Sequence, residues 1–126
     1  MEGIKCGCSH ATHLFNAMTG FAHREPGVVG AVFDSDITTE TISDGIHISF
    51  PSLRVAYKQK GTDKVLLVTD AMMACGMPDG KYSLGGQDVF VKEGAARLEA
   101  GSLAPSTSGA IVIETTASAQ SPTICS

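Results

Sequence analysis

The sequence is poor in basic residues, with 9 Lys and Arg against 13 Asp and Glu, and these basic residues form no run. The formal net charge of -4 therefore offers no basic surface for nucleic acid, and we expect no nucleic-acid partner. No stretch approaches the roughly 18 uninterrupted apolar residues of a membrane span, and the N-terminal segment lacks the apolar core of a signal peptide. These absences predict a cytoplasmic protein with no membrane partner.

The four cysteines, at positions 6, 8, 75 and 125, include no C-x-x-C pair. Cys6 and Cys8 are too close together for an ordinary disulfide or for a zinc-knuckle pair. We therefore expect reduced thiols with structural or incidental roles, as is usual in a cytosolic chain.

The first half of the chain alternates strand and helix patterns. The β-branched residues of 37–42 predict a strand, and residues 52–60 predict a helix that Pro51 opens and Gly61 ends. Residues 65–68 are four branched apolar side chains in a row, which predicts a strand buried on both faces. This α/β alternation is typical of a parallel sheet. A whole (β/α)₈ barrel takes about 250 residues, so a barrel pattern in this chain would be a piece of one.

The segment before these elements predicts a short strand over residues 1–12 that runs into His13. A loop over residues 13–30 follows, because it is rich in small and turn-forming residues and carries His, Asn and Arg side chains. Residues 28–33 are apolar, and their spacing fits a short helix or a buried turn equally well.

Beyond position 76 the pattern changes to short alternating segments, separated by turns that contain glycine. Residues 81–84, 87–92 and 95–98 predict an antiparallel β-meander.

Residues 105–126 contain one charged residue, Glu114, and nine Ser or Thr residues, which predicts a disordered tail with 110–113 as one candidate strand. The chain is thus divided into α/β units over 1–76, a meander over 77–104 and the tail.

Three residues that could do chemistry each follow a predicted strand: His13, His47 and Asp70. In a parallel sheet the carboxyl ends of the strands share one edge, where ligands and catalytic groups gather. Each residue also has a structural interpretation: Asp70 as a helix cap, His13 as a structural imidazole and His47 as a residue that merely precedes a helix. Together they suit hydrolysis at a divalent metal, with a carboxylate that shuttles the proton.

Asn16 and Arg24 lie in the loop after His13 and add an amide and a guanidinium that suit a phosphate oxygen. Either residue could equally be a loop hydrogen-bonder or a surface cation.

Four motifs follow one another in a fixed order: HLFNAM at 13–18, REPG at 24–27, DGIH at 44–47 and LVTDA at 67–71. In order and separation they resemble the N-acetylglucosamine-6-phosphate deacetylases of the amidohydrolase superfamily. The resemblance covers about Cys8 to Ala104 and includes Gly-Ser-Leu-Ala at 101–104. It implies a partial (β/α)₈ TIM barrel, its last strands present, that hydrolyses N-acetylglucosamine 6-phosphate to glucosamine 6-phosphate and acetate.

By this resemblance, His13 is a metal ligand from the sixth barrel strand and Asp70 is the catalytic acid and base from the eighth. The metal is a divalent ion, with zinc expected first and iron, cobalt, manganese or cadmium as alternatives. The family's Glu and second His ligands come from earlier strands and have no counterpart in this sequence.

The resemblance also assigns the substrate contacts. Asn16 and the backbone at Ala17 match sugar-phosphate contacts, and His47 matches a substrate-binding imidazole. Arg24 matches an arginine that reaches the phosphate across a subunit interface, so a homodimer or larger homo-oligomer is expected.

Because the upstream ligands are missing, we expect the chain to be a C-terminal portion that is inactive alone. Two alternatives stay open. One is another amidohydrolase that acts on a different amide, and the other is a non-catalytic fragment that associates with full-length subunits.

Overall fold

The computed structural model describes residues 1–109, 111–113 and 123–125. It divides into two compact units, the first formed by Met1–Ile42 with Ile48–Val68 and the second by Ser43–His47 with Thr69–Ser126. The second unit thus takes in residues 43–47 and 69–76, which the sequence pattern had grouped with the α/β part. None of the helices in the described part of the chain has the length and apolar content needed to cross a bilayer.

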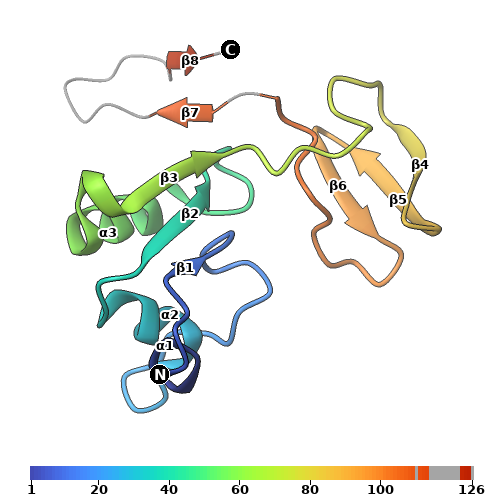
Figure 1. Ribbon diagram of the computed structural model, residues 1–126. Helices are drawn as coiled ribbons and strands as arrows, with labels where there is room; N and C mark the ends of the chain where they lie inside the picture. The colour runs from blue at the N-terminus through green and yellow to red at the C-terminus, as the bar shows by residue number, and fades with distance from the viewer. Residues whose placement is uncertain (110, 114–122, 126) are drawn as a thin grey trace. The chain divides into compact units, whose positions relative to one another are not determined.

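The first unit is built on a parallel sheet of three strands in the order β1 (His10–Ala11), β2 (Thr38–Ile42) and β3 (Val65–Val68) (Figure 1). His10 pairs with Thr38, and Thr39 pairs with Val65. Because all three strands are parallel, the chain leaves each of them at the same edge of the sheet. The predicted parallel α/β pattern is confirmed, and no closed barrel is formed by the described residues.

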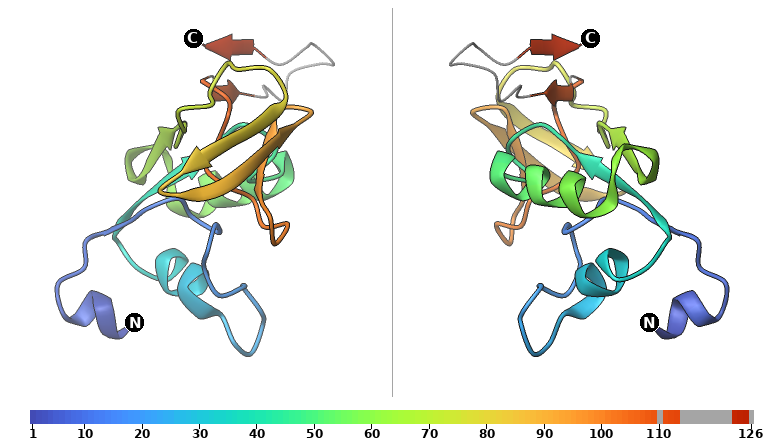
Figure 2. Two further views of the ribbon diagram at one scale, coloured as in Figure 1. Left: turned by 90° about the vertical axis from the view of Figure 1, so that its right-hand side faces the viewer. Right: turned by 90° about the vertical axis from the view of Figure 1, so that its left-hand side faces the viewer.

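The helix that follows β2 begins and ends where local sequence signals place it. α2 (Gly27–Phe33) connects β1 to β2, and α3 (Phe50–Lys60) lies beside β2 and β3 (Figure 2). α3 has a proline in its first turn, and Gly61 ends it with φ +74°, a left-handed conformation that glycine adopts without strain. The helix predicted over 52–60 is confirmed, and the undecided segment at 28–33 is helical.

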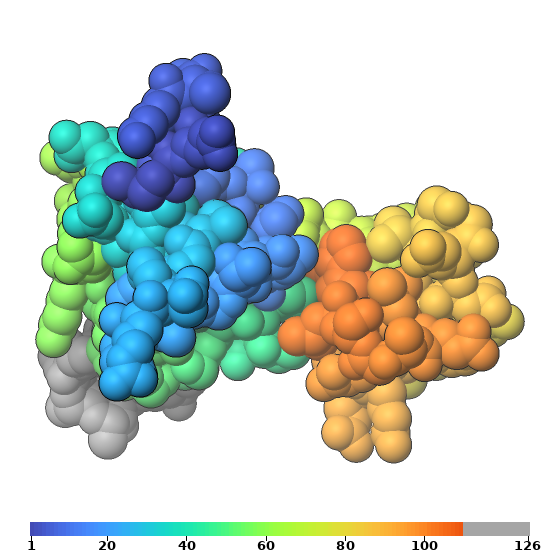
Figure 3. Space-filling model, turned by 90° about the horizontal axis from the view of Figure 1, so that it is seen from below, coloured from blue at the N-terminus to red at the C-terminus, as the bar shows by residue number. Residues whose placement is uncertain are grey.

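The N-terminal segment differs from the strand that the sequence predicted. Residues 2–5 form a single helical turn, α1 (Glu2–Lys5), and only His10 and Ala11 are extended. The turn buries none of its side chains, and the first residues protrude from the unit in Figure 3. The few apolar residues of this segment therefore have no sheet partner that would hold them in a strand.

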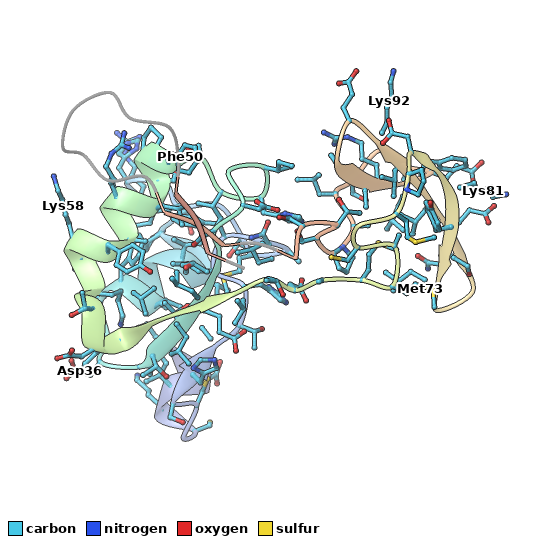
Figure 4. All side chains as sticks on the ribbon, turned by 90° about the horizontal axis from the view of Figure 1, so that it is seen from above. Asp36, Phe50, Lys58, Met73, Lys81 and Lys92 are labelled. Atoms are coloured by element: carbon cyan, nitrogen blue, oxygen red, sulfur yellow. The ribbon has the colours of Figure 1, made fainter. Side chains whose placement is uncertain are left out.

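The apolar core of the first unit lies where α2, α3 and the loop after β1 meet. Its fully buried members are Leu14, Val29, Val32 and Ala56. The Lys60 ammonium is buried beside them and donates to the carbonyl oxygens of Val32 (2.9 Å) and Ser35 (2.7 Å). These bonds tie the end of α3 to the end of α2, while Lys58 points outward (Figure 4).

The side chains of β3 are less buried than the sequence predicted. The sequence predicted a strand buried on both faces, but Leu66 is 46% exposed. β3 pairs only with β2 and so lies at an edge of the described sheet. An apolar strand in that position presents side chains that further strands or helices would cover in a larger sheet.

The second unit contains the predicted antiparallel meander, formed by β4 (Gly80–Leu84), β5 (Gln87–Lys92) and β6 (Ala95–Leu98). Along β5 the buried side chains are Val89 and Val91, whereas their neighbours in the sequence face solvent. Lys81 and Lys92 point outward in Figure 4. Met72, Ala74, Ala96 and Ala104 complete its core.

The segment from Pro105 onward departs from the expected disordered tail. Ser106 is 2% exposed and forms backbone bonds with Asp70 and Met72. β7 (Ile111–Ile113) and β8 (Thr123–Cys125) pair antiparallel. The rest of the expected tail, residues 110, 114–122 and 126, lies outside the described residues.

Neighbouring valines of α2 allow a matched test of this packing. Val29 is 1% exposed and Val28 is 45% exposed. Because Val29→Ala leaves a cavity in the core, it should lower the free energy of unfolding by about 1–3 kcal/mol, whereas Val28→Ala should change it by less than about 0.5 kcal/mol. Urea unfolding followed by circular dichroism measures both, and equal losses would contradict the assigned helix face.

Candidate active site

The loop after β1 has an unusual backbone. His13, Phe15 and Ala17 have φ angles of 36°, 73° and 54°, in the left-handed region that residues other than glycine seldom adopt. Leu14 holds the loop in place, because its side chain is fully buried and its amide donates to the carbonyl oxygen of Glu40 in β2 at 2.8 Å. Strained backbone of this kind collects at functional sites, where the surrounding structure enforces it.

The strained backbone orients the His13 ring. Its Nδ1 lies 3.1 Å from the carbonyl oxygen of Asn16, which can only accept, so Nδ1 carries the hydrogen when the bond forms. The lone pair of the neutral ring is then on Nε2, which has no hydrogen-bond partner among the described residues. Histidines that bind metals are commonly held in this way. The geometry of His13 therefore fits that of a single metal ligand.

Among the residues that the structure describes, His13 lacks the further ligands that a complete metal site needs. No group of three or more His, Cys, Asp or Glu side chains that could hold a metal occurs in residues 1–109, 111–113 and 123–125. A catalytic zinc ion takes three protein ligands and keeps a fourth position for water or substrate. The described residues therefore do not form a metal site by themselves.

Asn16, Ala17 and Arg24 offer groups that suit an anion. The Asn16 amide nitrogen donates to the Leu14 carbonyl oxygen at 3.2 Å, which fixes the side chain and leaves its oxygen available. The Ala17 amide has no acceptor within the described ranges. Arg24 is exposed, and it makes no hydrogen bond or ion pair with any described residue. Free amides and a free guanidinium can bind phosphate oxygens.

The second unit holds a tightly bonded pair, Asp44 and His47. One carboxylate oxygen of Asp44 accepts the backbone amides of Ile46 (2.9 Å) and His47 (2.8 Å). The other lies 2.7 Å from His47 Nδ1, and His47 Nε2 lies 2.9 Å from the Ala104 carbonyl oxygen. The His47 and Asp44 side chains are only 7% and 4% exposed. Both nitrogens of the predicted substrate-binding imidazole are thus bonded within the chain.

These contacts favour the charged form of Asp44. Burial raises the pKa of Asp44, but hydrogen bonds from the His47 amide, the His47 ring and the Ile46 amide outweigh it and hold the pKa below its ordinary value. The Asp44 carboxylate is thus held by three bonds from its own turn.

Asp70 lies two residues after β3, and its backbone is also left-handed, with φ 49°. Aspartate tolerates this conformation better than most residues do. Its side chain is exposed and has no hydrogen-bond partner among the described residues, whereas its carbonyl oxygen accepts the Ser106 amide at 2.8 Å. The fold thus fixes the backbone of Asp70 and leaves its carboxylate exposed to solvent.

The structure joins the predicted site residues into two groups. His13, Asn16 and Ala17 share the strained loop of the first unit, and Arg24 makes no described contact with them. Asp44, His47 and Asp70 belong to the second unit, where Ser106 touches both Asp44 and Asp70. Sequence reasoning missed Ser106, because a run rich in Ser and Thr suggests disorder and carries no sign of burial.

No protein-family model matches the chain. Over 106 residues it is 51% identical to the N-acetylglucosamine-6-phosphate deacetylase of Lysinibacillus sphaericus, a match that covers 83% of this chain and 27% of the relative. This chain is a homologue of part of the N-acetylglucosamine-6-phosphate deacetylases. The predicted resemblance to this family is confirmed.

Two further comparisons also match the chain to part of a sugar-phosphate deacetylase. The crystal structure of the N-acetylglucosamine-6-phosphate deacetylase from Thermotoga maritima is similar with a TM-score of 0.81 at 41% identity, over 85% of this chain and 30% of that one. The N-acetylgalactosamine-6-phosphate deacetylase of Escherichia coli O157:H7 is 42% identical over 102 residues, or 80% of this chain and 27% of the relative. The chain thus spans less than a third of each of these deacetylases.

The lowered pKa of Asp44 predicts how the free energy of unfolding depends on pH. Because the folded pKa lies below the ordinary 3.8, the charged carboxylate stabilises the fold fully above that pH, and this contribution is lost as the pH falls through the folded pKa. Asp44→Asn should therefore lower the free energy of unfolding at pH 7 by about 1–3 kcal/mol, and its deficit should shrink below pH 3.8.

Thermal unfolding of the wild type and the variant between pH 7 and pH 3 measures this deficit. Asp34→Asn is the matched control, because Asp34 is exposed at the end of α2. A deficit for Asp44→Asn that stays constant across this range would contradict the lowered pKa.

Proposed function

We propose that the chain supplies part of the active site of a metal-dependent deacetylase that hydrolyses N-acetylglucosamine 6-phosphate to glucosamine 6-phosphate and acetate. The observation that carries the proposal is the exposed Asp70 carboxylate, on a left-handed backbone two residues after β3, in a chain 51% identical over 106 residues to a named deacetylase. A carboxylate with a fixed backbone and no internal partner is suited to general acid and base catalysis.

A divalent ion, zinc in the first place and iron, cobalt, manganese or cadmium as alternatives, would polarise the acetyl carbonyl and activate water. His13 would bind it through Nε2, with the Asn16 carbonyl fixing the ring. The other ligands would come from parts of the whole protein beyond these 126 residues.

Asp70 would accept a proton from the attacking water and deliver it to the amine nitrogen as the C–N bond breaks. One water is consumed, and acetate and the amino sugar phosphate are released. His47, whose ring is fixed by Asp44, would lie beside the substrate.

Asn16, the Ala17 amide and Arg24 would bind the phosphate. Because Arg24 is exposed and makes no hydrogen bond or ion pair with any described residue, it is available to a site on a second subunit, which supports a homodimer or larger homo-oligomer. We also propose that the parallel strands belong to a (β/α)₈ barrel in the whole protein, which would cover the exposed Leu66.

A cytoplasmic location fits this function. Cys6, Cys8 and Cys75 are free thiols, and a phosphorylated sugar does not cross membranes unaided.

The second candidate substrate is N-acetylgalactosamine 6-phosphate, because a deacetylase named for that sugar is 42% identical to this chain. The two sugars differ only in the orientation of one hydroxyl. The proposed phosphate and acetyl contacts serve both, so the choice depends on residues that contact that hydroxyl.

The decisive variant is Asp70→Asn, made in a chimera in which this chain replaces its counterpart in the Lysinibacillus sphaericus deacetylase. Asparagine also tolerates a left-handed backbone but cannot accept the proton, so kcat should fall about 10²–10⁴-fold while KM changes less than about threefold. Acetate release from N-acetylglucosamine 6-phosphate measures both constants.

Asp34→Asn is the matched control and should retain full activity. Near-normal turnover by Asp70→Asn would refute its role as the acid and base. A higher kcat/KM of the unmutated chimera for N-acetylgalactosamine 6-phosphate would assign the second substrate instead. A folded chimera that releases acetate from neither sugar would favour a non-catalytic module.

A further inference from the structure

Ser106 connects the two predicted site segments of the second unit. Its backbone amide donates to the Asp70 carbonyl oxygen at 2.8 Å, and its own carbonyl oxygen accepts the Met72 amide at 2.9 Å. Its hydroxyl lies 3.1 Å from the carboxylate oxygen of Asp44 that also bonds His47 Nδ1. With 2% of its surface exposed, Ser106 makes these contacts away from water. One residue thus holds the strand end at Asp70 and the Asp44–His47 pair together.

The hydroxyl is directed at Asp44 by its other neighbours. The Ser108 amide donates to the Ser106 oxygen at 3.0 Å, so the single hydroxyl hydrogen must serve an acceptor elsewhere. The alternative acceptor, the Ser108 carbonyl oxygen, is 3.5 Å away, at the limit of a hydrogen bond. The charged Asp44 oxygen at 3.1 Å is the closer and stronger acceptor.

The bond to Ser106 completes the set of donors around Asp44. The carboxylate accepts the Ile46 amide, the His47 amide, the His47 ring and the Ser106 hydroxyl. The first three come from the same short turn as Asp44. Among the described residues, Ser106 is the donor to Asp44 that comes from another segment, and the bond from His47 Nε2 to the Ala104 carbonyl oxygen joins the same turn to that segment.

Ser106, Asp44 and His47 do not form a nucleophilic triad, although the residue types match one. In such a triad the serine donates to the histidine, which in turn is oriented by the carboxylate. Here the serine donates to the carboxylate, and both histidine nitrogens are occupied by Asp44 and Ala104. A buried hydroxyl of this kind orients the pair and attacks no substrate.

We infer that Ser106 is a positioning residue that fixes the Asp44–His47 pair relative to the backbone of Asp70. This role rests on the proposed function, because only there do His47 and Asp70 meet the substrate. The coupling between the segments is a property of this chain and needs no substrate to be observed. A change in the position of either segment should therefore change the position of the other, because Ser106 is hydrogen-bonded to both.

NMR spectroscopy of the full chain tests this coupling. Asp44→Asn should shift the ¹³C signal of the Asp70 carbonyl, and the shift should fall to less than about one-third in a Ser106→Ala background, since the connecting bond is then absent. In Ser106→Ala alone, the Ile46 and His47 amides should lose about tenfold in protection from hydrogen exchange, and the β5 amides should be unchanged.

Ser106→Thr retains the hydroxyl and should restore the coupling, whereas Ser83→Ala, on an exposed position of β4, should leave it intact. If the NMR spectrum of the Ser106→Ala variant lacks the dispersed signals of a folded protein, the Ser106→Cys variant is measured in its place. Cysteine has a volume similar to that of serine and is a weaker hydrogen-bond donor. An equal Asp70 shift in both backgrounds, or no rescue by threonine, would overturn the inference. Because no turnover is measured, failure of the deacetylase proposal would leave this result unaffected.

Discussion

The pairing of β2 with β1 on one side and β3 on the other is the constraint on which the first unit depends. Thr39 and Thr41 in β2 are fully buried, and their hydroxyls donate to the carbonyl oxygens of Ala11 (2.9 Å) and Leu66 (3.4 Å). A central strand can bury threonine at low cost when its hydroxyls are satisfied in this way. This pairing makes the three strands parallel, so the strained loop that carries His13 begins at the edge where the other two strands also end.

The two groups of candidate residues differ in how they are held. His13 and Asn16 are oriented by local bonds within a loop whose backbone is strained. Asp44 and His47 are buried and orient each other, and the hydrogen bonds to Asp44 lower its pKa despite its burial. Asp70 has a fixed backbone and a free carboxylate. Rigid supports around free chemical groups are what a catalytic site requires.

Patterns with a clear physical cause allowed most of the fold to be predicted. The β-branched run at 37–42, the proline and glycine that bound α3, and the alternation of β5 each act locally, and each is found as expected. The exposure of Leu66 could not be predicted, because an apolar run records what a strand is suited to pack against and not whether the partner is present.

The sequence singles out His13, His47 and Asp70 because each follows a predicted strand, whereas Asn16 and Arg24 are singled out by their place in a loop. The left-handed backbone at Phe15 and Ala17 has no signature in those residue types. Ser106 also escaped prediction, because its burial depends on a long-range pairing with residues 70–72. Long-range contacts of this kind are set by the fold as a whole and not by local composition.

The central proposal is that this chain supplies proton-transfer and substrate-binding groups to a deacetylase, and that His13 alone among the described residues would bind its metal. The most direct measurement is acetate release from N-acetylglucosamine 6-phosphate, with added Zn²⁺, by the chain alone and by its chimera with the Lysinibacillus sphaericus enzyme. We expect turnover by the chimera and, for the chain alone, none above a His13→Ala control. Turnover by the chain alone at the rate of the chimera would contradict it.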